Sequence, residues 1–277
     1  MKVAVLGSSG GMGSYFADYF ARLGHNVAGS DLRPGRSHAR FRFARTNLEA
    51  VEGADVVLLA VPMSETLNVA RGVAQALKSG CTLVEITSVK GSRLSVLRKL
   101  ATAHGASLLS VHPMFGPSSR SKAPKILVVG TRKDLAAAGR VFPGSKLILV
   151  GSHEHDRLMA HTLSLVHLTN IAFVSAVEKG SGVTEYDRIA PPFAAAQLEL
   201  AKAVLSQDPR LYSQIDTENR SAAAALSALI AELSSLKDLI ERKDSKALSE
   251  EFKRAARWFT VSEMQSSLAR VYSAADG

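Results

Sequence analysis

The sequence predicts an α/β fold, with an N-terminal, doubly wound and mainly parallel sheet followed by an all-helical C-terminal domain. Strand and helix patterns alternate over residues 1–151, which is typical of consecutive βαβ units. From residue 152 to residue 277 the patterns are helical, and no convincing strand is found. A hydrophobic content of 46% in 277 residues allows a substantial core.

The strands expected in the first domain are short apolar runs. Residues 56–61 are continuously apolar and are followed by Pro62, as expected of a parallel strand buried on both faces. Helices are expected from residue 14 to residue 23, from 65 to 77, and from about residue 92. The expected strands are 2–6, 26–30, 56–61, 82–86, 107–111, 125–129 and 146–150, and a short segment near 41–43 follows a basic loop after the second of them.

The C-terminal domain, residues 152–277, is expected to consist of helices rich in Ala, Leu, Glu and Lys. These helices cover residues 157–178, 192–206, 221–242 and 246–274. Their apolar faces are longer than one small bundle needs, so we expect a homodimer.

A glycine-rich turn follows the first strand. Residues 1–13 read MKVAVLGSSGGMG, and Gly7, Gly10 and Gly13 are spaced G-x-x-G-x-x-G, which departs from the usual G-x-G-x-x-G. Glycines permit a tight turn and let backbone N–H groups approach a pyrophosphate, which the helix dipole also favours. With a strand before it and an amphipathic helix after it, the turn predicts a dinucleotide-binding domain of the Rossmann type over residues 1–151. A plain βαβ unit that binds no nucleotide is the alternative.

The second strand ends at Asp31, 18 residues after Gly13, near the spacing of about 20 expected for a carboxylate that binds the adenosine ribose. This carboxylate favours NAD because it would repel a 2′-phosphate, whereas Arg33 and Arg36 leave NADP open. The residues expected to contact the cofactor are Gly7, Ser8, Ser9, Gly10, Gly11, Met12, Gly13, Asp31, Leu32, Arg33, Val61 and Pro62.

Composition argues against several other classes of protein. The net charge is +9, but the basic residues are scattered and are not interleaved with aromatic residues, so no nucleic-acid partner is expected. No apolar run approaches a membrane span, and the first strand begins too early for a signal peptide. Cys81 is the single cysteine, which excludes an internal disulfide and fits the cytoplasm. The segment 153–156, His-Glu-His-Asp, lacks further metal ligands and is better explained as the start of a helix, so no metal is expected.

A histidine follows the strand at residues 107–111. His112 begins the sequence HPMFGP, whose proline and glycine predict a stiff loop over the nucleotide. A neutral imidazole there suits a general base that takes a proton from an alcohol as hydride leaves. Ser88, at the end of the neighbouring strand, is expected to hydrogen-bond either this imidazole or the same hydroxyl. A structural loop histidine is the alternative.

The combination of GSSGGMG, ITSVK at residues 86–90 and HPMFGP resembles the prephenate dehydrogenase family of tyrosine biosynthesis. The resemblance continues through His155-Asp156, His167-Leu168, residues 187–190, and the segment from Asp208-Pro209 to Glu218-Asn219. It covers nearly the whole chain, more weakly after residue 220.

The resemblance implies oxidative decarboxylation of prephenate to 4-hydroxyphenylpyruvate, with hydride transfer to NAD. It implies that His112 is the base, that Ser88 is its hydrogen-bonding partner, and that Arg188 clamps a substrate carboxylate. His167 and Asn170 are three residues apart on one helix and are expected to line the substrate pocket. The alternatives are a core histidine at position 167 and a surface ion pair of Arg188 with Asp187 or Glu185.

Other functions remain open at this point. Arogenate dehydrogenase shares the chemistry, but its substrate bears an amine where prephenate has a keto group. A β-hydroxyacid dehydrogenase would need a catalytic lysine on the first long helix of the second domain, where only Lys179 occurs, at the end. A non-catalytic dinucleotide sensor would need no base.

Overall fold

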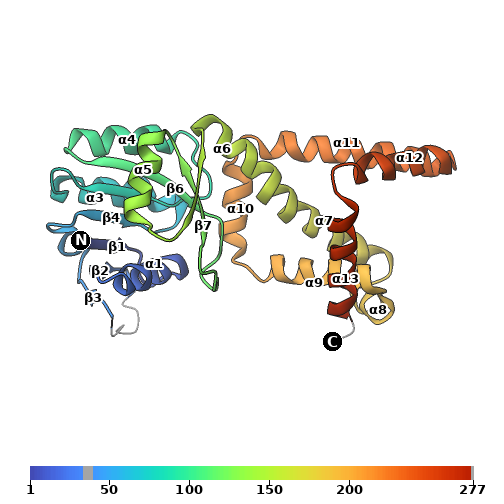
Figure 1. Ribbon diagram of the computed structural model, residues 1–277, viewed down its shortest axis with the longest axis horizontal. Coiled ribbons are helices and arrows are strands. Elements are labelled where there is room, and N and C mark those ends of the chain that lie inside the picture. The colour runs from blue at the N-terminus through green and yellow to red at the C-terminus, as the bar shows by residue number, and fades with distance from the viewer. Residues whose placement is uncertain (34–39, 276–277) are drawn as a thin grey trace. The chain divides into compact units, whose positions relative to one another are not determined.

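The computed structural model describes residues 1–33 and 40–275 and has two compact units, Met1–Met159 and Ala160–Gly277 (Figure 1). Arg36, considered above for NADP binding, lies outside the described residues. The division follows helix α6 (Ser152–Met159), so this helix is grouped with the sheet. It is tied to the sheet by hydrogen bonds that join His155 to His112 and Asp156 to the backbone of Lys90, described below.

The first unit contains one sheet with the strand order β3-β2-β1-β4-β5-β6-β7-β8. All neighbouring strands are parallel except β6 and β7, so the prediction of a doubly wound, mainly parallel sheet is confirmed. The chain reverses its winding direction between β1 and β4, and ligands bind at such a switch point, beyond the carboxyl ends of the strands. The strands are β1 (Lys2–Leu6), β2 (Asn26–Ser30), β3 (Arg42–Phe43), β4 (Val56–Leu59), β5 (Thr82–Glu85), β6 (Ser107–Pro113), β7 (Lys125–Val129) and β8 (Lys146–Val150).

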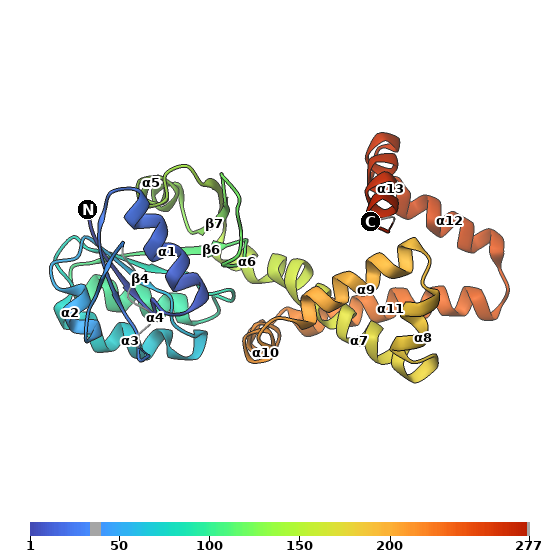
Figure 2. The ribbon, with the colours of Figure 1, turned by 90° about the horizontal axis from the view of Figure 1, so that it is seen from below.

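Helices cover both faces of this sheet, and Figure 2 shows α1 on the opposite side from α3 and α4. Because side chains alternate along a strand, Val3 and Val5 pack with α1 and α5, whereas Ala4 and Leu6 pack on the other face. Both cores are almost completely buried and apolar. The covering helices are α1 (Gly11–Arg22) and α5 (Arg132–Val141) on one face, and α2 (Asn47–Val51), α3 (Thr66–Val73) and α4 (Arg93–Ala103) on the other.

A helix and a strand of the first unit differ in extent from what the sequence predicts. The helix expected at 65–77 is a short α3 between two 3₁₀ turns, Met63–Glu65 and Ala74–Ala76. The strand expected to end at residue 111 continues to Pro113, because His112 and Pro113 pair with the antiparallel strand β7. His112 is therefore held in the sheet, and the expected stiff loop begins only after it.

The second unit is helical, as predicted. The helix expected at 157–178 corresponds to α6, one π-helical turn (Ala160–Ser164) and α7 (Leu165–Gly180). The long helix expected at 246–274 is two helices, because Thr260 and Glu263 form a capping box that begins a new helix. The other helices are α8 (Val183–Ile189), α9 (Pro192–Leu205), α10 (Pro209–Glu218), α11 (Ala222–Glu241), α12 (Ser245–Ala256) and α13 (Val261–Ala275).

This unit leaves many large apolar side chains exposed. The most exposed include Ile240, Phe252, Trp258 and Val261, each with more than 60% of its surface accessible. The helical run Ser152–Gly180 has a mean hydropathy of 1.3 over an 18-residue window, 22% of which is buried, so by length and composition it could cross a membrane. The expectation that no apolar run approaches a membrane span was therefore wrong for this segment.

Candidate active site and dinucleotide-binding turn

The turn between β1 and α1 can be formed only with glycine at two positions. Gly7 has a φ of +87°, and a Cβ atom there would lie 2.5 Å from the carbonyl oxygen of Ala60. A Cβ atom on Gly13 would lie 1.9 Å from the carbonyl oxygen of Gly7. The glycines thus bring the turn against the end of β4 and against the start of α1.

The first turn of α1 presents free backbone donors. Gly11, Met12 and Gly13 are its first three residues, whose N–H groups have no acceptor within the helix. The N-cap residue is Gly10, which provides no side-chain acceptor, and the first turn contains no acidic residue. This donor set fits a pyrophosphate.

Asp31 lies directly after β2 and is tied to the turn. Its Oδ2 accepts a hydrogen bond from the Ser9 N–H at 3.0 Å, and its Oδ1 accepts one from the Arg33 N–H at 3.1 Å. Ser8 is buried beneath the turn, whereas Leu32 is fully exposed. The carboxylate keeps lone pairs for ribose hydroxyls, so the residues present fit a dinucleotide.

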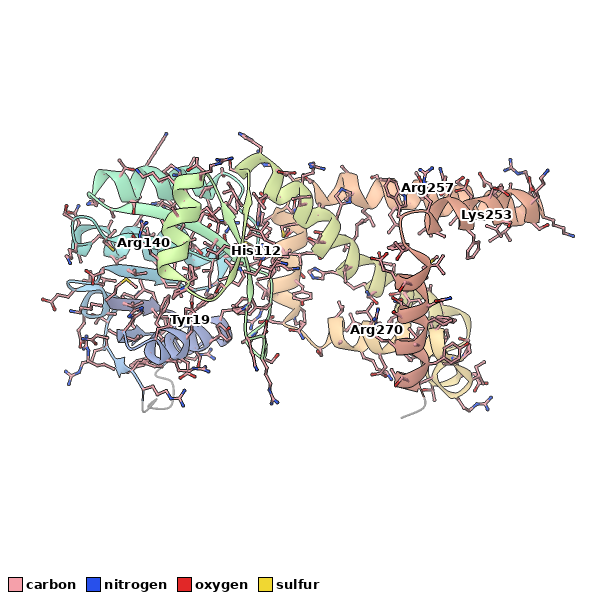
Figure 3. All side chains as sticks on the ribbon, in the orientation of Figure 1. Tyr19, His112, Arg140, Lys253, Arg257 and Arg270 are labelled. Atoms are coloured by element: carbon pink, nitrogen blue, oxygen red, sulfur yellow. The ribbon has the colours of Figure 1, made fainter. Side chains whose placement is uncertain are left out.

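The HPMFGP segment lies beside this turn. A Cβ atom on Gly11 would meet Pro117 Cγ at 2.8 Å, and the rings of Phe115 and Tyr15 have centroids 5.0 Å apart. The segment after β6 therefore packs on the start of α1. This contact places His112 and the phosphate-binding turn at the same edge of the sheet, and Figure 3 shows His112 among the surrounding side chains.

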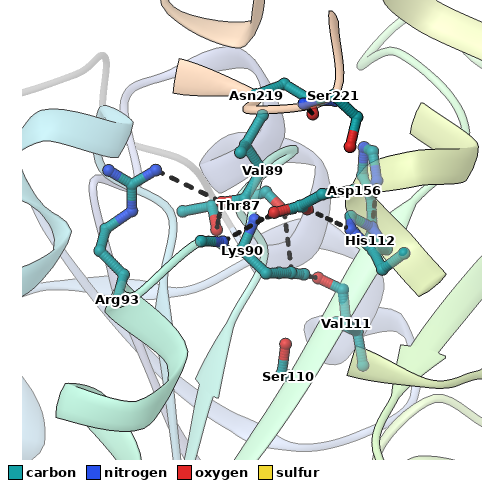
Figure 4. Close-up of polar contacts among 12 residues, drawn as sticks. Thr87, Val89, Lys90, Arg93, Ser110, Val111, His112, Asp156, Asn219 and Ser221 are labelled. Atoms are coloured by element: carbon teal, nitrogen blue, oxygen red, sulfur yellow. Dashed lines mark hydrogen bonds and ion pairs between the residues drawn. The ribbon is translucent and has the colours of Figure 1, made fainter. Parts of the chain in front are cut away.

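His112 is buried and belongs to a chain of hydrogen bonds (Figure 4). Its Nδ1 lies 3.1 Å from His155 Nε2, and His155 Nδ1 lies 2.8 Å from Asp156 Oδ1. Asp156 in turn accepts hydrogen bonds from the backbone N–H groups of Lys90 at 2.9 Å and Gly91 at 2.8 Å. Within the described residues, His112 Nε2 has no hydrogen-bond partner.

The surroundings of these groups shift their pKa values. Burial, followed by the charge of Lys90, lowers the pKa of His112 well below 6.5, and burial also lowers the pKa of His155. Burial opposes ionisation of Asp156, but hydrogen bonds from His155, Lys90 and Gly91 outweigh it and lower the pKa of Asp156 to about 2. At pH 7 the imidazoles are neutral and Asp156 is a carboxylate.

A buried ion pair lies beneath His112. Lys90 Nζ is 2.6 Å from Glu85 Oε1 and donates hydrogen bonds to the carbonyl oxygens of Thr87 and Val111, both at 2.8 Å. Ser110 and Thr87 hydroxyls donate to the Glu85 carboxylate. Burial opposes ionisation of Glu85, but Lys90 and these hydroxyls hold its pKa below the usual value, whereas burial lowers the pKa of Lys90.

Ser88 lies on the segment after β5, next to β6, as expected. Among residues 1–33 and 40–275, however, no hydrogen bond joins Ser88 to His112. The Nδ1 atom of His112 is occupied by His155 instead, because α6 brings that ring against β6. The described residues thus show no contact of Ser88 with the imidazole, and hydrogen bonding of Ser88 to the imidazole or to a substrate hydroxyl stays a prediction.

In the second unit, His167 and Asn170 are buried on one face of α7, as expected. His167 Nδ1 lies 3.2 Å from Asp216 Oδ1, and its ring stacks on Tyr212 with centroids 4.0 Å apart. Asn170 accepts a hydrogen bond from Gln197 Nε2 at 3.0 Å. Both side chains are thus already held by neighbouring helices.

Arg188, near the end of α8, lies at the surface with 67% of its side chain exposed. Its Nε donates to Glu185 Oε2 at 2.8 Å, and its second guanidinium contact is also with Glu185. This is one of the two surface ion pairs considered from the sequence. Binding of a substrate carboxylate by Arg188 would replace this pair.

Several residues of the site were given no role from the sequence. The sequence explains residues 153–156 as the start of a helix, and it gives no role to Glu85, within the expected strand 82–86, or to Lys90, at the end of ITSVK. The available signal was an acid, Glu85, directly after the apolar residues Leu83 and Val84, with a lysine, Lys90, five residues later, since buried charges of this kind need a partner. The pairing of His155 with His112 depends on elements 43 residues apart and leaves no local signal.

The doubly wound sheet, the glycine turn with its acidic strand end and the separate helical unit define a class of protein, the dehydrogenases that use a nicotinamide dinucleotide. Two family models match the chain: "Prephenate dehydrogenase, nucleotide-binding domain" over residues 16–130 and "Prephenate dehydrogenase, dimerization domain" over residues 151–254. The chain belongs to the prephenate dehydrogenase family.

Individual proteins agree with this assignment. The chain is 26% identical over 273 residues to a probable arogenate/prephenate dehydrogenase of Methanocaldococcus jannaschii, covering 94% of this chain but 61% of that relative. It is 27% identical over 261 residues to a 4-amino-4-deoxyprephenate dehydrogenase of Streptomyces pristinaespiralis, covering 90% of this chain and 88% of the relative. The prephenate dehydrogenase of Aquifex aeolicus, solved with hydroxyphenyl propionate and NAD+, has the same fold, with a TM-score of 0.75, 19% identity, and coverage of 96% and 98%.

Proposed function

We propose that this protein catalyses the oxidative decarboxylation of prephenate to 4-hydroxyphenylpyruvate with NAD. The observation that carries the proposal is a neutral, buried His112 near the carboxyl end of β6, at the same edge of the sheet as the dinucleotide-binding turn, whose Nε2 has no hydrogen-bond partner among residues 1–33 and 40–275. The free nitrogen suits the abstraction of a proton from a hydroxyl group.

In this reaction the protein mainly positions the substrate and transfers one proton. His112 Nε2 takes the proton of the C4 hydroxyl. When bound at the glycine turn, NAD would supply the acceptor for the hydride that leaves C4. The bond from C1 to the carboxylate then breaks, and its electron pair makes the ring aromatic as CO2 leaves. His112 returns the proton to the phenolate oxygen, so the reaction releases no net proton. Aromatisation supplies most of the driving force, which leaves orientation as the task of the site.

The experiment that tests this function follows the formation of NADH or NADPH with prephenate and with arogenate, each with NAD and with NADP. We expect the highest kcat/KM with prephenate and NAD. Faster turnover of arogenate would instead assign an arogenate dehydrogenase. Because the relative from Streptomyces pristinaespiralis is a 4-amino-4-deoxyprephenate dehydrogenase, 4-amino-4-deoxyprephenate is the third substrate to assay. Turnover of a β-hydroxyacid alone, or cofactor binding without any turnover, would contradict the proposal.

The preference for NAD is expected to depend on Asp31. We expect Asp31→Ser to raise KM for NAD about tenfold, because the hydrogen bonds to the ribose hydroxyls are lost. We also expect a smaller ratio of kcat/KM for NAD to kcat/KM for NADP, because the carboxylate no longer repels a 2′-phosphate. The measurement is kcat/KM with each cofactor. Glu52→Gln, at an exposed carboxylate on the same unit, is the matched control. An unchanged cofactor ratio in Asp31→Ser would contradict the role of this carboxylate.

We propose that Arg188, His167 and Asn170 bind the substrate, as the family resemblance implies. Arg188→Gln is expected to raise KM for prephenate about tenfold with a smaller change in kcat, because a bidentate contact with a carboxylate is lost. Initial rates over a range of prephenate concentrations measure this effect, and Arg254→Gln, at another exposed arginine of the helical unit, should leave KM unchanged. Equal KM values in the two variants would remove Arg188 from the substrate site.

We also propose a cytoplasmic homodimer, formed through the helical unit. The exposed apolar side chains described above support this, as does an apolar hollow of about 510 Å³. That hollow is lined by Phe193, Phe259, Met264, Leu268 and Val271, among others. Cys81 is buried and burial raises the pKa of its thiol to about 11, which fits a cysteine that stays reduced.

A further inference from the structure

Hydrogen bonds connect His112 through His155 to the carboxylate of Asp156. We propose that His155 and Asp156 are positioning residues, which hold His112 in the tautomer with a proton on Nδ1 and an unprotonated Nε2. The chemical purpose of this arrangement rests on the proposed function. The arrangement itself is a property of the protein and can be measured without any substrate.

The donors and acceptors follow one another along the chain. Asp156 is ionised and can only accept hydrogen bonds, so His155 Nδ1 must carry a proton. A neutral imidazole carries one N–H, so His155 Nε2 must be an acceptor. The proton in the 3.1 Å contact between the two rings therefore belongs to His112 Nδ1. The lone pair of His112 is then on Nε2, where proton abstraction needs it.

The far end of the chain is rigidly held. Both oxygens of Asp156 accept backbone N–H groups from the segment after β5, at Lys90 and Gly91. The His155 side chain is completely buried. These contacts tie α6 to the strand ends and leave the two rings little freedom to rotate, as is typical of a hydrogen-bonded group that orients a catalytic histidine.

The same chain offsets the charge that appears on His112. When Nε2 takes a proton, the Nδ1–H keeps its hydrogen bond to His155, and the carboxylate of Asp156 faces the positive charge. The Lys90 ammonium opposes this charge, and Glu85, which is paired with Lys90, offsets part of that effect. Of Lys90, Glu85 and Asp156, it is Asp156 that is connected to His112 by hydrogen bonds, through the imidazole of His155.

Nuclear magnetic resonance tests the tautomer directly. Two-bond ¹H–¹⁵N correlations of the full chain labelled with ¹⁵N-histidine show which ring nitrogen is protonated, and signals missing in His112→Asn assign His112. We expect a protonated Nδ1 and an unprotonated Nε2 on His112 in the free protein near pH 7. In Asp156→Asn, the amide side chain also donates, so we expect a mixture of tautomers. A protonated Nε2 in the natural protein, or unchanged His112 signals in Asp156→Asn, would overturn the proposal.

Kinetics separate positioning from mere packing. His155→Leu is expected to lower kcat about tenfold or more, and His155→Gln to restore most of it, because the Gln oxygen can accept from His112 Nδ1–H. Asp156→Asn is expected to move the acid limb of kcat/KM to lower pH, since the carboxylate raises the pKa of His112. His153→Gln, at an exposed histidine of the same helix, is the control.

A purely structural role predicts a different pattern. His155→Leu and His155→Gln would then lose activity equally, and the acid limb of Asp156→Asn would not move, which would contradict the proposal. If the protein turned over none of the substrates, the proposed function would fail, but the tautomer of His112 in the resonance spectrum would still decide this inference.

Discussion

His112→Asn is expected to lower kcat with prephenate by about 10² or more, because proton transfer in the transition state by a positioned base contributes 10² to 10⁴. Asn has no lone pair basic enough to take the hydroxyl proton. Its amide can still donate a hydrogen bond to His155, so the fold around β6 should be preserved. The Kd for NAD, measured by fluorescence titration, is expected to stay near that of the natural protein.

The pH dependence of the reaction should identify the same group. The base must be unprotonated, and the pKa of His112 lies well below 6.5 because the ring is buried and near Lys90. We therefore expect kcat/KM to be constant above that pKa and to fall as the pH decreases through it. The residual activity of His112→Asn should lack this acid limb. Full activity of His112→Asn would show that another group is the base.

Lys90→Met is expected to destabilise the protein by about 3–5 kcal/mol, because it leaves the Glu85 carboxylate buried without its partner. Equilibrium unfolding in urea at pH 8 measures this loss. Replacing both residues, as Glu85→Leu with Lys90→Met, should recover much of it, since a buried ion pair is often no more stabilising than apolar side chains of similar volume. The exposed pair of Lys78 and Asp55 supplies the control, Lys78→Met, for which little change is expected.

The destabilisation of Lys90→Met should depend on pH in a definite direction. In the natural protein the pKa of Glu85 is held below its usual value, so its stabilising contribution is present above about pH 4.5 and is lost as the pH falls through the lowered pKa. In Lys90→Met, burial without the cation should raise the pKa of Glu85 above its usual value. The variant should then gain stability as the pH falls through that raised pKa. If the free energies of unfolding of Lys90→Met and of the natural protein differed by the same amount at pH 5 and at pH 8, this explanation would be contradicted.

The local parts of the fold could be predicted from the sequence because their signals are contained in short segments. The apolar runs located seven of the eight strands within two residues, and four of them, Lys2–Leu6, Asn26–Ser30, Lys125–Val129 and Lys146–Val150, were located without error. The predicted glycine turn has Gly7 in the left-handed region, and Asp31 follows β2 as expected. The missed break between α12 and α13 had a local signal too, the capping box of Thr260 and Glu263.

Contacts between distant segments could not be predicted in this way. Antiparallel β7 draws His112 into the sheet, and α6 supplies His155 to its Nδ1. The burial that shifts the pKa of His112, and the pairing of Lys90 with Glu85, also arise only when the strands are assembled.

The sequence by itself determined the fold class, the place of the dinucleotide turn and the family. The apolar pattern of the strands, the spacing of the glycines and the motifs each lie within a short contiguous segment, so they can be recognised without the tertiary structure. Only the tertiary structure decided the partners and the charge state of the candidate base. Those depend on the distances and the burial that packing creates between α6, β5 and β6.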